Sequence, residues 1–524
     1  MRLLYLLILA VLTTFCPLAA ATNSITLPDL STLGQTGGWA IADSASVRLL
    51  SDAASSYIET TLPAGAAKAE ATATYDIPLE SIRGAVVLVS VEARAVNVQQ
   101  PEKAYLGIKL MLHTSSPTAG DSYPQADGNG KTFPVNYDWK RLSFRAMAPK
   151  DAVMARLVLG IQDTSGTVDF HSPQVRVVAR AVEAPDKTPA GPIYTGHGQG
   201  ALRGTMAATG IKADDIPVLG SWGANVVRYQ IAFPKSTATE SQGDFDAAVD
   251  GVLDHLDQII PVFNQYGIKV ALVQMGTPGG RDSANTCEKL FSDPAWQSYF
   301  ISRWEKTARR YKGNKTIWAY DLLNEPVLGD IAPGLLDWHD LAERTARAIR
   351  SIDKEHAIVV EPDPWADPSA LSYFSPIDVP GVVYSVHMYS PHEFTHQGVY
   401  SNPVGAVYPG VIAGRTWDKN TVRATLQPAI DYGKMFHVQI YVGEFSAARW
   451  AKGADRYLAD VIDVCEDNHW DWSYHAFREW QGWSPELGED KSVTTPAASP
   501  TARLLVLQKA FSKNQQFSSI KGYK

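Results

Sequence analysis

Hydrophobic and polar residues alternate in short runs over the first third of the chain, from residue 23 to about residue 182. Residues 85–91 form one such run, and turn-forming pairs such as Asp127-Gly128 separate it from the next ones. An alternation with period two is typical of strands that bury one face, whereas helical periodicity is almost absent here. The pattern predicts an all-β sandwich over residues 22–182 and favours a jelly roll.

The pattern changes after residues 183–196, a stretch whose three prolines predict a semi-rigid linker. From residue 197 onward, apolar runs of strand length alternate with amphipathic segments of helix length. The eight strand-like runs are residues 202–206, 225–230, 268–274, 316–322, 357–360, 382–387, 439–442 and 472–477. The helices expected between them include residues 245–266, 294–311, 335–352 and 454–468.

These eight strand–helix repeats predict an α/β fold, a (β/α)8 TIM barrel over residues 197–515, with a short tail over residues 516–524. An open, doubly wound sheet is the alternative topology. No glycine-rich dinucleotide loop follows the first expected strand, and this favours the barrel.

The amino terminus has the features of an export signal. Arg2 precedes an apolar run over residues 3–12, and three alanines at positions 19–21 supply the small residues that signal peptidase requires. The run is too short for a permanent membrane anchor, and no further apolar stretch reaches membrane length. We therefore expect a signal peptide over residues 1–21 and a secreted protein, either extracellular or periplasmic.

Composition narrows the range of partners. The 524 residues carry a formal net charge of −8, which argues against nucleic acid, because phosphate binding needs clustered Lys and Arg. A neutral polysaccharide is compatible with this charge, and the 14 Trp and 22 Tyr include candidates for stacking on sugar rings. Only Cys287 and Cys465 remain after the signal peptide, and whether they pair is left open. A monomer is expected.

Two glutamates follow the fourth and seventh expected strands of the barrel. Residues 317–323 lead into Asn324-Glu325-Pro326, and residues 440–443 lead into Glu444-Phe445. Reactive side chains of such barrels gather at the carboxyl ends of the strands, so the two glutamates should face each other. Cleavage of a glycosidic bond with retention needs such a pair about 5 Å apart, one to protonate the leaving oxygen and one to attack the anomeric carbon.

Five motifs in this order resemble glycoside hydrolase family 5 over residues 197 to about 513. The matching segments are Asn225-Val226-Val227-Arg228, Leu323-Asn324-Glu325-Pro326, His387-Met388-Tyr389, Val442-Gly443-Glu444-Phe445 and Trp480. The resemblance implies a retaining O-glycosyl hydrolase that needs no metal or other cofactor. It also implies that Glu325 is the acid/base and Glu444 the nucleophile.

Supporting roles follow from the same resemblance. Arg228 and the hydroxyl of Tyr389 would hold the charge of the nucleophile. Asn324 would bond the 2-hydroxyl of the sugar, and His387 would orient the acid or bind substrate. Trp480 would form the floor beneath the sugar next to the cleaved bond.

One feature departs from the family pattern, and the identity of the stacking tryptophan is left open. Strand three of the family often ends in Asp-x-His, but here Val273-Gln274-Met275 stands in its place. The acid/base chemistry does not need that histidine, although substrate recognition can differ. Trp483 lies three residues after Trp480 and could serve as the platform instead.

Residues His392-Glu393-Phe394-Thr395-His396 satisfy the His-Glu-x-x-His pattern of zinc proteases. That pattern binds zinc only on a helix, where the two histidines share a face. The neighbouring Pro391 and Gly398 instead predict a loop that shapes the substrate cleft, as similar stretches do in family 5. A zinc peptidase therefore remains a minor alternative.

The amino-terminal sandwich resembles, more loosely, carbohydrate-binding modules attached to glycosidases. The likeness lies in residues 138–144 and 160–168. Trp39, Tyr105, Tyr137 and Trp139 are possible stacking residues. Binding of carbohydrate and support of the barrel are both open as roles for this domain.

The combined expectation is a hydrolase that cleaves internal β-glycosidic bonds of a polysaccharide. β-1,4-Glucan is the first expected substrate and β-mannan the second. An exo-acting β-glycosidase and a non-catalytic polysaccharide-binding protein are the alternatives, and two intact glutamates argue against the latter.

Overall fold

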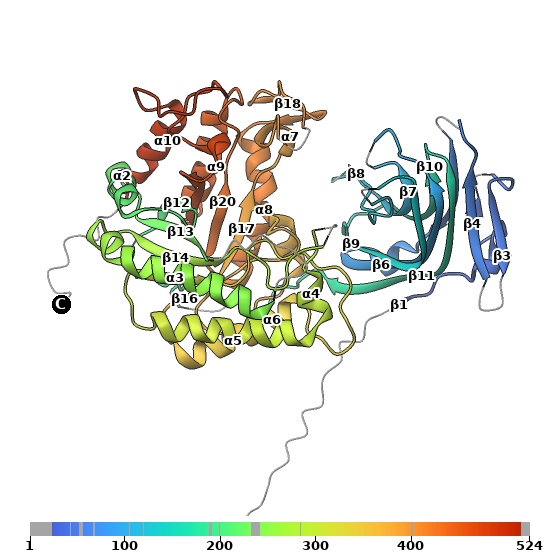
Figure 1. The fold of residues 1–524 in the computed structure, drawn as a ribbon, viewed down its shortest axis with the longest axis horizontal. Coiled ribbons are helices and arrows are strands. Elements are labelled where there is room, and N and C mark those ends of the chain that lie inside the picture. Colours follow the sequence, from blue (N-terminus) through green and yellow to red (C-terminus); the bar gives the residue numbers. More distant parts are fainter. Residues whose placement is uncertain are drawn as a thin grey trace, which may run out of the picture. The chain divides into compact units, whose positions relative to one another are not determined.

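A computed structural model describes residues 24–514 except 42, 52–55, 66–68, 104, 119, 131, 188–190, 199, 232–240, 283–284 and 400–401. The expected signal peptide and the expected tail lie outside the described residues. The chain divides into two compact units, coloured blue to blue-green and green to red in Figure 1. Most of residues 24–178 belong to the first unit, and the second consists of the chain from Ala179 onward together with the short segments Ala126–Thr132 and Ser143–Arg145.

The first unit is a sandwich of two antiparallel sheets, as the alternating pattern predicts. One sheet has the order β3-β4-β11-β6-β9, with β1 also paired to β11, and the other has the order β2-β5-β10-β7-β8. The strands of the first sheet are β1 Ser24–Ile25, β3 Val47–Ser51, β4 Ser56–Leu62, β6 Ala85–Val98, β9 Val135–Ala148 and β11 Gly166–Arg180. Those of the second sheet are β2 Ala40–Ile41, β5 Glu70–Asp76, β7 Gly107–Ser116, β8 Gly120–Ser122 and β10 Met154–Gln162. A 3₁₀ turn, η1 Leu30–Thr32, and a helical turn, α1 Leu79–Ile82, connect strands.

Alternation along the strands fills the sandwich core. In β4, Ile58, Thr60 and Leu62 are buried while their neighbours are partly exposed, as a strand with one inward face requires. The prediction of Trp39 as a sugar-stacking residue is wrong, because its side chain is fully buried. Tyr105 is 57 % exposed and stays a candidate for stacking on a sugar ring.

The second unit contains a closed barrel of eight parallel strands (Figure 1). In order around the barrel the strands are β12 Arg203–Ala207, β13 Val226–Ile231, β14 Lys269–Gln274, β15 Ile317–Asp321, β16 Ala357–Val360, β17 Val382–Met388, β20 Ile440–Phe445 and β21 Asp471–Phe477. The barrel closes where β21 pairs with β12. The TIM-barrel prediction is confirmed, and each expected run forms one strand.

Helices surround the strands in Figure 1. They are α2 Ile216–Trp222, α3 Gln242–Gln265, α4 Glu288–Ser292, α5 Pro294–Tyr311, α6 Trp338–Ile352, α7 His392–Thr395, α8 Lys419–Phe436, α9 Ala454–Asp467 and α10 Ala502–Phe511. Short 3₁₀ turns are η2 Ala213–Asp215, η3 Pro368–Tyr373 and η4 Gln481–Trp483, and β18 Gly410–Ile412 pairs with β19 Arg415–Trp417.

Local sequence signals explain where the long helices begin. Ser241 and Asp244 form a capping box at the start of α3, so each side chain bonds a backbone N–H of the other residue. Asp293 caps α5 by accepting from the N–H of Ala295, and Pro294 fits the first helical position because its missing N–H would have no partner there. The buried residues of α3 recur every three or four positions, which turns one face towards the strands.

The barrel interior is packed near the beginnings of its strands. The side chains that fill it are Leu202, Val226, Ala271, Trp318, Ala319, Ala357, Val359, Val383 and Tyr441. A larger apolar core lies between the strands and the outer helices. Because the amino-terminal ends are filled by apolar groups, polar groups are left for the opposite, carboxyl ends of the strands.

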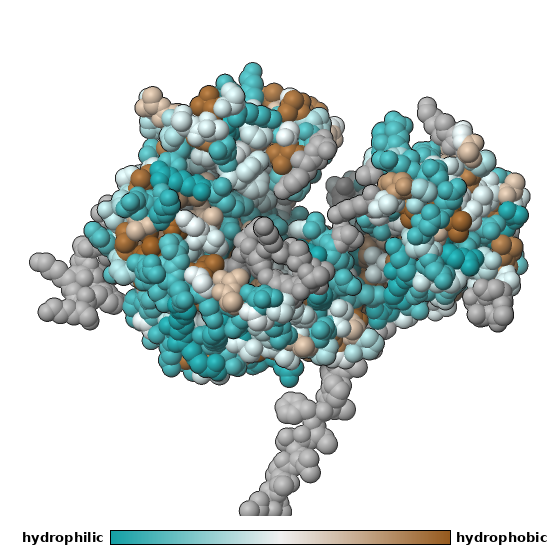
Figure 2. Space-filling model, in the orientation of Figure 1, coloured by the Kyte–Doolittle hydropathy of each residue, from teal (hydrophilic) through white to brown (hydrophobic). Residues whose placement is uncertain are grey.

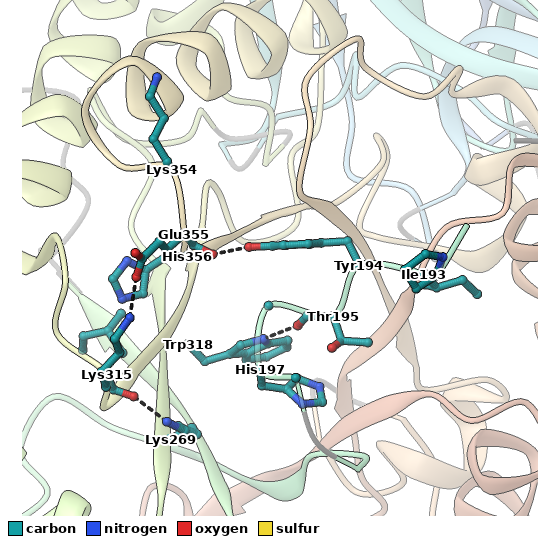
Figure 3. A pocket seen from close by; sticks show the side chains of 14 residues that line it. Ile193, Tyr194, Thr195, His197, Lys269, Lys315, Trp318, Lys354, Glu355 and His356 are labelled. Carbon is teal, nitrogen blue, oxygen red and sulfur yellow. Dashed lines mark hydrogen bonds and ion pairs between the residues drawn. The ribbon is translucent and has the colours of Figure 1, made fainter. Parts of the chain in front are cut away.

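A cavity of about 580 Å³ lies where the linker meets the amino-terminal ends of β14, β15 and β16 (Figure 3). Tyr194 donates a hydrogen bond to the carbonyl of Glu355, and the indole N–H of Trp318 donates to the carbonyl of Thr195 at 2.6 Å. These bonds fasten the end of the linker to the base of the barrel. The cavity is thus at the end remote from the two glutamates.

The surface and the cysteines bear on the remaining expectations. The face of the molecule seen in Figure 2 is mostly hydrophilic with small, separate apolar spots. No helix in the described part of the chain combines the length and the apolar character needed to span a bilayer.

Cys287 and Cys465, whose pairing the sequence leaves open, are both buried and free, so they do not form a disulfide with each other.

Candidate active site

Arg228 lies at the centre of a buried polar network at the carboxyl ends of the strands. It comes from β13, and its side chain is 0 % exposed. The guanidinium donates to Asp321 at 2.9 Å, to Glu361 at 2.6 Å and to Glu444 at 2.6 Å. A guanidinium fork suits this arrangement, since it can satisfy several carboxylates in fixed directions at once.

Asn324 completes the shell of Arg228. Its side-chain oxygen accepts from the guanidinium at 3.0 Å, which leaves the amide N–H₂ group to face other partners. Burial raises the pKa of Asp321 to about 7, although the charge of Arg228 acts in the opposite direction. One cation therefore holds a cluster of acids that cannot all be ionised without mutual repulsion.

Glu444 is a buried carboxylate surrounded by donors. It lies within β20, and its side chain is 4 % exposed. Besides the bond from Arg228, it accepts from the hydroxyl of Tyr389 at 2.9 Å, and His475 lies 3.1 Å away. Burial raises the pKa of Glu444, but the charges of His387, His475 and Arg228 outweigh burial and hold it well below its ordinary value. Glu444 is thus ionised in the folded protein.

Tyr389 and His475 form the second support of Glu444. Burial and the neighbouring Glu444 raise the pKa of Tyr389 well above its ordinary value, so its hydroxyl stays protonated and donates. Burial acts to lower the pKa of His475, but the carboxylates of Glu444 and Glu479 raise it to about 9. The ring of His475 is therefore cationic at neutral pH, and its Nδ1 lies 2.6 Å from the hydroxyl of Tyr389.

Glu325 has different surroundings, because it lies on the loop after β15. Its side chain is 22 % exposed, and its backbone φ of +48° is in the left-handed region that non-glycine residues seldom adopt. The loop is held in this conformation by its backbone groups. The N–H of Glu325 donates to Glu361 at 2.7 Å, and its carbonyl accepts from Arg281 at 2.6 Å.

His387 connects the two halves of the site. Its Nδ1 is 2.8 Å from Glu325, its Nε2 is 3.3 Å from Glu361, and Glu444 lies 3.8 Å from Nδ1. Burial acts to lower the pKa of His387, but the charges of Glu361 and Glu444 and the bond to Glu325 raise it well above its ordinary value. As a cation His387 donates from Nδ1 to Glu325, while Nε2 makes an ion pair with Glu361 without a hydrogen bond.

The separation of the two glutamates indicates the chemistry that they can perform. One carboxylate oxygen of Glu325, one of Glu444 and one ring nitrogen of His387 all lie within 4.8 Å of one another. Retaining glycosidases place their carboxyl groups about 5 Å apart, whereas inverting enzymes need roughly 6.5–9.5 Å to admit a water molecule. The geometry therefore fits a nucleophile with an acid/base partner.

The same three groups could in principle ligate a metal ion. They form the one cluster of three potential metal ligands found among the described residues. The guanidinium of Arg228 is already 2.6 Å from Glu444, and His475 is cationic beside it. A dication would meet two resident positive charges there, which favours the acid/base use of these carboxylates.

Tryptophans border the Glu444 side of the site. Trp483 stacks on Tyr389 with ring centroids 5.4 Å apart and planes inclined by 23°. Trp480 is 38 % exposed, and its ring lies 4.9 Å from that of Trp483 and 6.2 Å from that of Trp450. Trp483 thus supports Tyr389 directly, while Trp480 presents a free aromatic surface next to it.

The structure brings together six of the seven residues singled out from the sequence. Glu325, Asn324, Arg228, His387, Tyr389 and Glu444 form one network of hydrogen bonds and ion pairs. Trp480 reaches this network through Trp483. Met275 and Val273 leave the end of β14 without an ionisable group, as their sequence indicates.

Sequence reasoning missed three members of the network. Glu361 directly follows β16, so the rule that selected Glu325 and Glu444 at strand ends would have found it. Asp321 is an acidic residue at the end of an otherwise apolar strand, and this was a second available signal. His475 lies inside β21, where the sequence alone does not tell which residues point into the barrel.

The prediction of a loop over residues 392–396 is wrong in part, because His392–Thr395 forms one turn of α-helix. Pro391 stands at the N-cap, a helix-start position that tolerates proline. Nδ1 of His392 lies 3.3 Å from Nδ1 of His396. Neither histidine belongs to a cluster of three potential metal ligands among the described residues.

Comparison with known proteins gives one family and several relatives. The sequence profile described as "Cellulase (glycosyl hydrolase family 5)" matches residues 197–480. Endoglucanase C of Acetivibrio thermocellus is 26 % identical over 286 residues, which cover 49 % of this chain and 81 % of that protein. Cellodextrinase A of Ruminococcus flavefaciens is 24 % identical over 299 residues, which cover 56 % of this chain and 82 % of that protein.

Part of the chain is similar to solved structures. The endoglucanase Cel5A from the hyperthermophilic Thermotoga maritima is 24 % identical and covers 58 % of this chain and 96 % of its own, with a TM-score of 0.47. A structure of Cel5A with mannotriose is 23 % identical and covers 59 % of this chain and 97 % of its own, with a TM-score of 0.46.

Proposed function

Because the chain belongs to glycosyl hydrolase family 5, the cellulase family, we propose that it cleaves internal β-1,4 bonds of a glucan with retention, using Glu325 and Glu444. The observation that carries the proposal is the pair of carboxylates within 4.8 Å, of which Glu444 is held ionised by buried donors. A surface that only bound polysaccharide would need no such pair.

In the first step, Glu444 attacks the anomeric carbon of the sugar on the glycone side. The bond from that carbon to the glycosidic oxygen breaks, and Glu325 gives its proton to the leaving oxygen. His387 donates to one carboxyl oxygen of Glu325, so the other oxygen can carry the transferred proton. The product is a glycosyl ester on Glu444 and a free chain end.

In the second step, Glu325 is ionised and takes a proton from a water molecule. The water oxygen attacks the anomeric carbon, the ester bond breaks, and Glu444 is restored as a carboxylate. Arg228 and Tyr389 hold this carboxylate through both steps with bonds of 2.6 and 2.9 Å. Two inversions at one carbon give net retention.

Support for a β-glucan comes from the relatives, which are named as endoglucanases and a cellodextrinase. Another relative is named as a mannan endo-1,4-β-mannosidase, with 28 % identity over 197 residues. The end of β14, where the Asp-x-His motif is replaced, is a point at which substrate choice can differ. β-Mannan is therefore the alternative polymer.

We also propose that the chain is exported, with the signal peptide in residues 1–21. A polymeric substrate does not cross a membrane, so an enzyme that hydrolyses it internally has to act outside the cell. Amino-terminal sequencing of protein recovered from the medium or periplasm should begin near Thr22. Recovery of the full chain from the cytoplasm alone would contradict the proposal.

Reducing-sugar release and viscosity, measured on β-1,4-glucan, β-mannan and xylan, test the function. We expect release from glucan with a rapid fall in viscosity, because internal cleavage shortens chains early. Glu444→Gln keeps the shape of the side chain and serves as the control, in which release should stop. Release of only monosaccharide or disaccharide without a fall in viscosity would replace the endo mode by an exo mode. No release from any of the three polymers by folded protein would overturn the proposal.

A further inference from the structure

The loop between β14 and α4 carries a cation that contacts the acid/base motif. Arg281 is partly buried in this loop. Nη2 of its guanidinium donates to the carbonyl of Asn324 at 3.1 Å and to the carbonyl of Glu325 at 2.6 Å. Nη1 donates to the carbonyl of Asn285, in the same loop, at 2.9 Å. Among the described residues, all hydrogen bonds of this guanidinium thus end on backbone carbonyls.

The two carbonyls of the acid/base motif that Arg281 binds are consecutive in the chain. Carbonyl oxygens that converge on one point repel each other through their partial negative charges, and a positive group between them turns this repulsion into attraction. The guanidinium supplies that group, and its charge makes each hydrogen bond stronger than one from a neutral donor. The backbone around Glu325 therefore depends on a side chain from another loop.

An anion holds the same backbone from the opposite side. The N–H of Glu325 donates to Glu361 at 2.7 Å. This N–H and the carbonyl of Asn324 belong to one trans peptide group and point in opposite directions. The dipole of that peptide group is therefore aligned between the carboxylate of Glu361 and the guanidinium of Arg281.

This alignment accounts for the unusual backbone of the acid/base. Glu325 has a φ of +48°, in the left-handed region. A residue with a side chain keeps such a conformation only where its surroundings determine it, and such residues gather at functional sites. The contacts with Arg281 and Glu361 provide those surroundings.

Arg281 is held at this position by the attachment of its loop. The N–H of Asn324 donates to the carbonyl of Gln274, the last residue of β14, at 3.0 Å. The N–H of Cys287 donates to the carbonyl of Val327 at 2.8 Å. These two bonds join the loops after β14 and β15 on both sides of Arg281 along the chain, so the guanidinium stays next to the carbonyls that it binds.

Proton transfer makes the orientation of Glu325 critical. Its carboxyl group has to lie within hydrogen-bond reach of the glycosidic oxygen when the bond breaks. The backbone conformation sets the direction of the side chain, so a change of φ to an ordinary negative value would move the carboxyl group away. A displacement of about 1 Å can cost roughly 10²-fold in rate.

We propose that Arg281 is a positioning residue for the acid/base, because it fixes the left-handed backbone of Glu325 and thereby directs the carboxyl group towards the leaving oxygen. This inference rests on the proposed function and adds to it a part in proton transfer for the loop after β14. Arg281 itself exchanges no proton, and the attack by Glu444 does not depend on it.

Two aryl cellobiosides with the same glycone isolate the proton transfer. The phenolate of phenyl β-cellobioside needs a proton to leave, whereas the dinitrophenolate of 2,4-dinitrophenyl β-cellobioside leaves without one. Both leaving groups are single aromatic rings, so a lost contact with the leaving group would affect both substrates. The measured quantity is the ratio of kcat/KM for the phenyl substrate to kcat/KM for the dinitrophenyl substrate. Because kcat/KM extends only to the first bond cleavage, the second step does not enter this ratio.

Arg281→Met is the variant to test, since methionine keeps an unbranched stem without the guanidinium. We expect the ratio to fall about tenfold, less than the roughly 10²–10⁴-fold contributed by a positioned proton donor, because the carboxyl group remains nearby. The value of kcat/KM for the dinitrophenyl substrate should stay close to that of the wild type. Arg281→Lys keeps a cation and should give an intermediate ratio. Arg344→Met removes an exposed arginine of α6 and should leave the ratio unchanged.

An unchanged ratio in Arg281→Met, or an equal loss on both substrates, would overturn the positioning role, the latter because it would indicate general damage to the site. Should Arg281→Met fail to fold, Arg281→Gln removes the charge but keeps an N–H₂ group, and an unchanged ratio in that variant would contradict the role equally. A wild-type protein that cleaves neither cellotetraose nor the aryl cellobiosides would overturn the proposed function. Cleavage of all three by the wild type separates that failure from a failure of Arg281.

Discussion

Glu325 and Glu444 belong to one polar network, yet their surroundings are opposite in burial and in how each side chain is held. Glu444 lies within a strand, is almost inaccessible, and receives hydrogen bonds on both carboxylate oxygens. Glu325 lies on a loop with a positive φ, is 22 % exposed, and is held mainly by its own backbone groups.

The difference follows from what each carboxylate has to do. A nucleophile must stay ionised, and burial among Arg228, Tyr389 and His475 achieves this because the donors stabilise only the charged form. An acid/base must lose and regain a proton in every turnover, which requires contact with water and one free oxygen. Contacts at the backbone fix the position of Glu325 without fixing its protonation.

The largest expected effect is the loss of turnover when the nucleophile is removed. The configuration of the product formed with azide then distinguishes the nucleophile from the acid/base. Glu444→Ala should reduce turnover by at least roughly 10⁴-fold, because no covalent intermediate can form. Azide can enter the space left by the carboxylate and attack the anomeric carbon once, so the product should be an α-glycosyl azide. Product analysis by NMR checks this, and a β-glycosyl azide from this variant would contradict the assignment of the nucleophile.

The next effect concerns the acid/base. Glu325→Ala should reduce cellotetraose hydrolysis by roughly 10²–10⁴-fold, the usual contribution of a positioned proton donor. An aryl cellobioside with a dinitrophenolate leaving group needs no proton, so its first step should be far less affected and should appear as a burst of released phenolate. Azide should rescue the second step and give a β-glycosyl azide. Equal losses on both substrates, without a burst, would be inconsistent with the acid/base role.

The third effect concerns the pH dependence of stability on the Glu444 side. The pKa of His475 is about 9 in the folded protein and about 6.5 in an unfolded chain. The protonated ring therefore stabilises the fold fully below pH 6.5, and this contribution disappears as the pH rises through 9. Its size is about 3 kcal/mol at most.

Calorimetric unfolding of the barrel at pH 6 and pH 10 measures this contribution. His475→Asn should lose the part of the pH dependence that lies between those values, whereas His339→Asn, on the outer helix α6, should keep it. If His475→Asn and the wild type showed the same pH dependence, the charge assigned to His475 would be wrong.

The strand-end rule explains how much of this site the sequence alone could predict. Glu325, Arg228, Tyr389 and Glu444 each follow or end an apolar run, so the parallel-barrel topology suffices to bring them together. The eight strands could be predicted for the same reason, because apolar runs of this length have to be buried on both faces.

Other features depend on three-dimensional detail that the pattern does not contain. The direction in which His475 points depends on the register of β21, and one residue of shift would turn it away from the barrel interior. The helical turn at His392–Thr395 is too short to show a period of 3.6 residues. The backbone groups of Glu325, which has a positive φ, bond to Glu361 and Arg281, residues distant in the sequence, so no local signal announces this conformation.

Glu361 contacts groups on both sides of the site, and changing it gives the smallest of the expected effects. It bonds Arg228 at 2.6 Å on the Glu444 side and the N–H of Glu325 at 2.7 Å on the acid/base side, with His387 3.3 Å away. Glu361→Gln keeps the shape but removes the charge that attracts His387. We expect kcat on cellotetraose to fall about tenfold, because the acid/base loop loses part of its alignment, and the pH optimum to move as His387 holds its proton less tightly.

The control for this change is Glu288→Gln, an exposed residue of α4 that should alter neither kcat nor the pH profile. If Glu361 only stabilised the fold, Glu361→Gln would lower the unfolding temperature and leave the pH profile of kcat in place. A shifted pH profile of kcat with an unchanged unfolding temperature would instead show that Glu361 couples the two catalytic glutamates. It would do so through its contacts with Arg228, with His387 and with the backbone of Glu325.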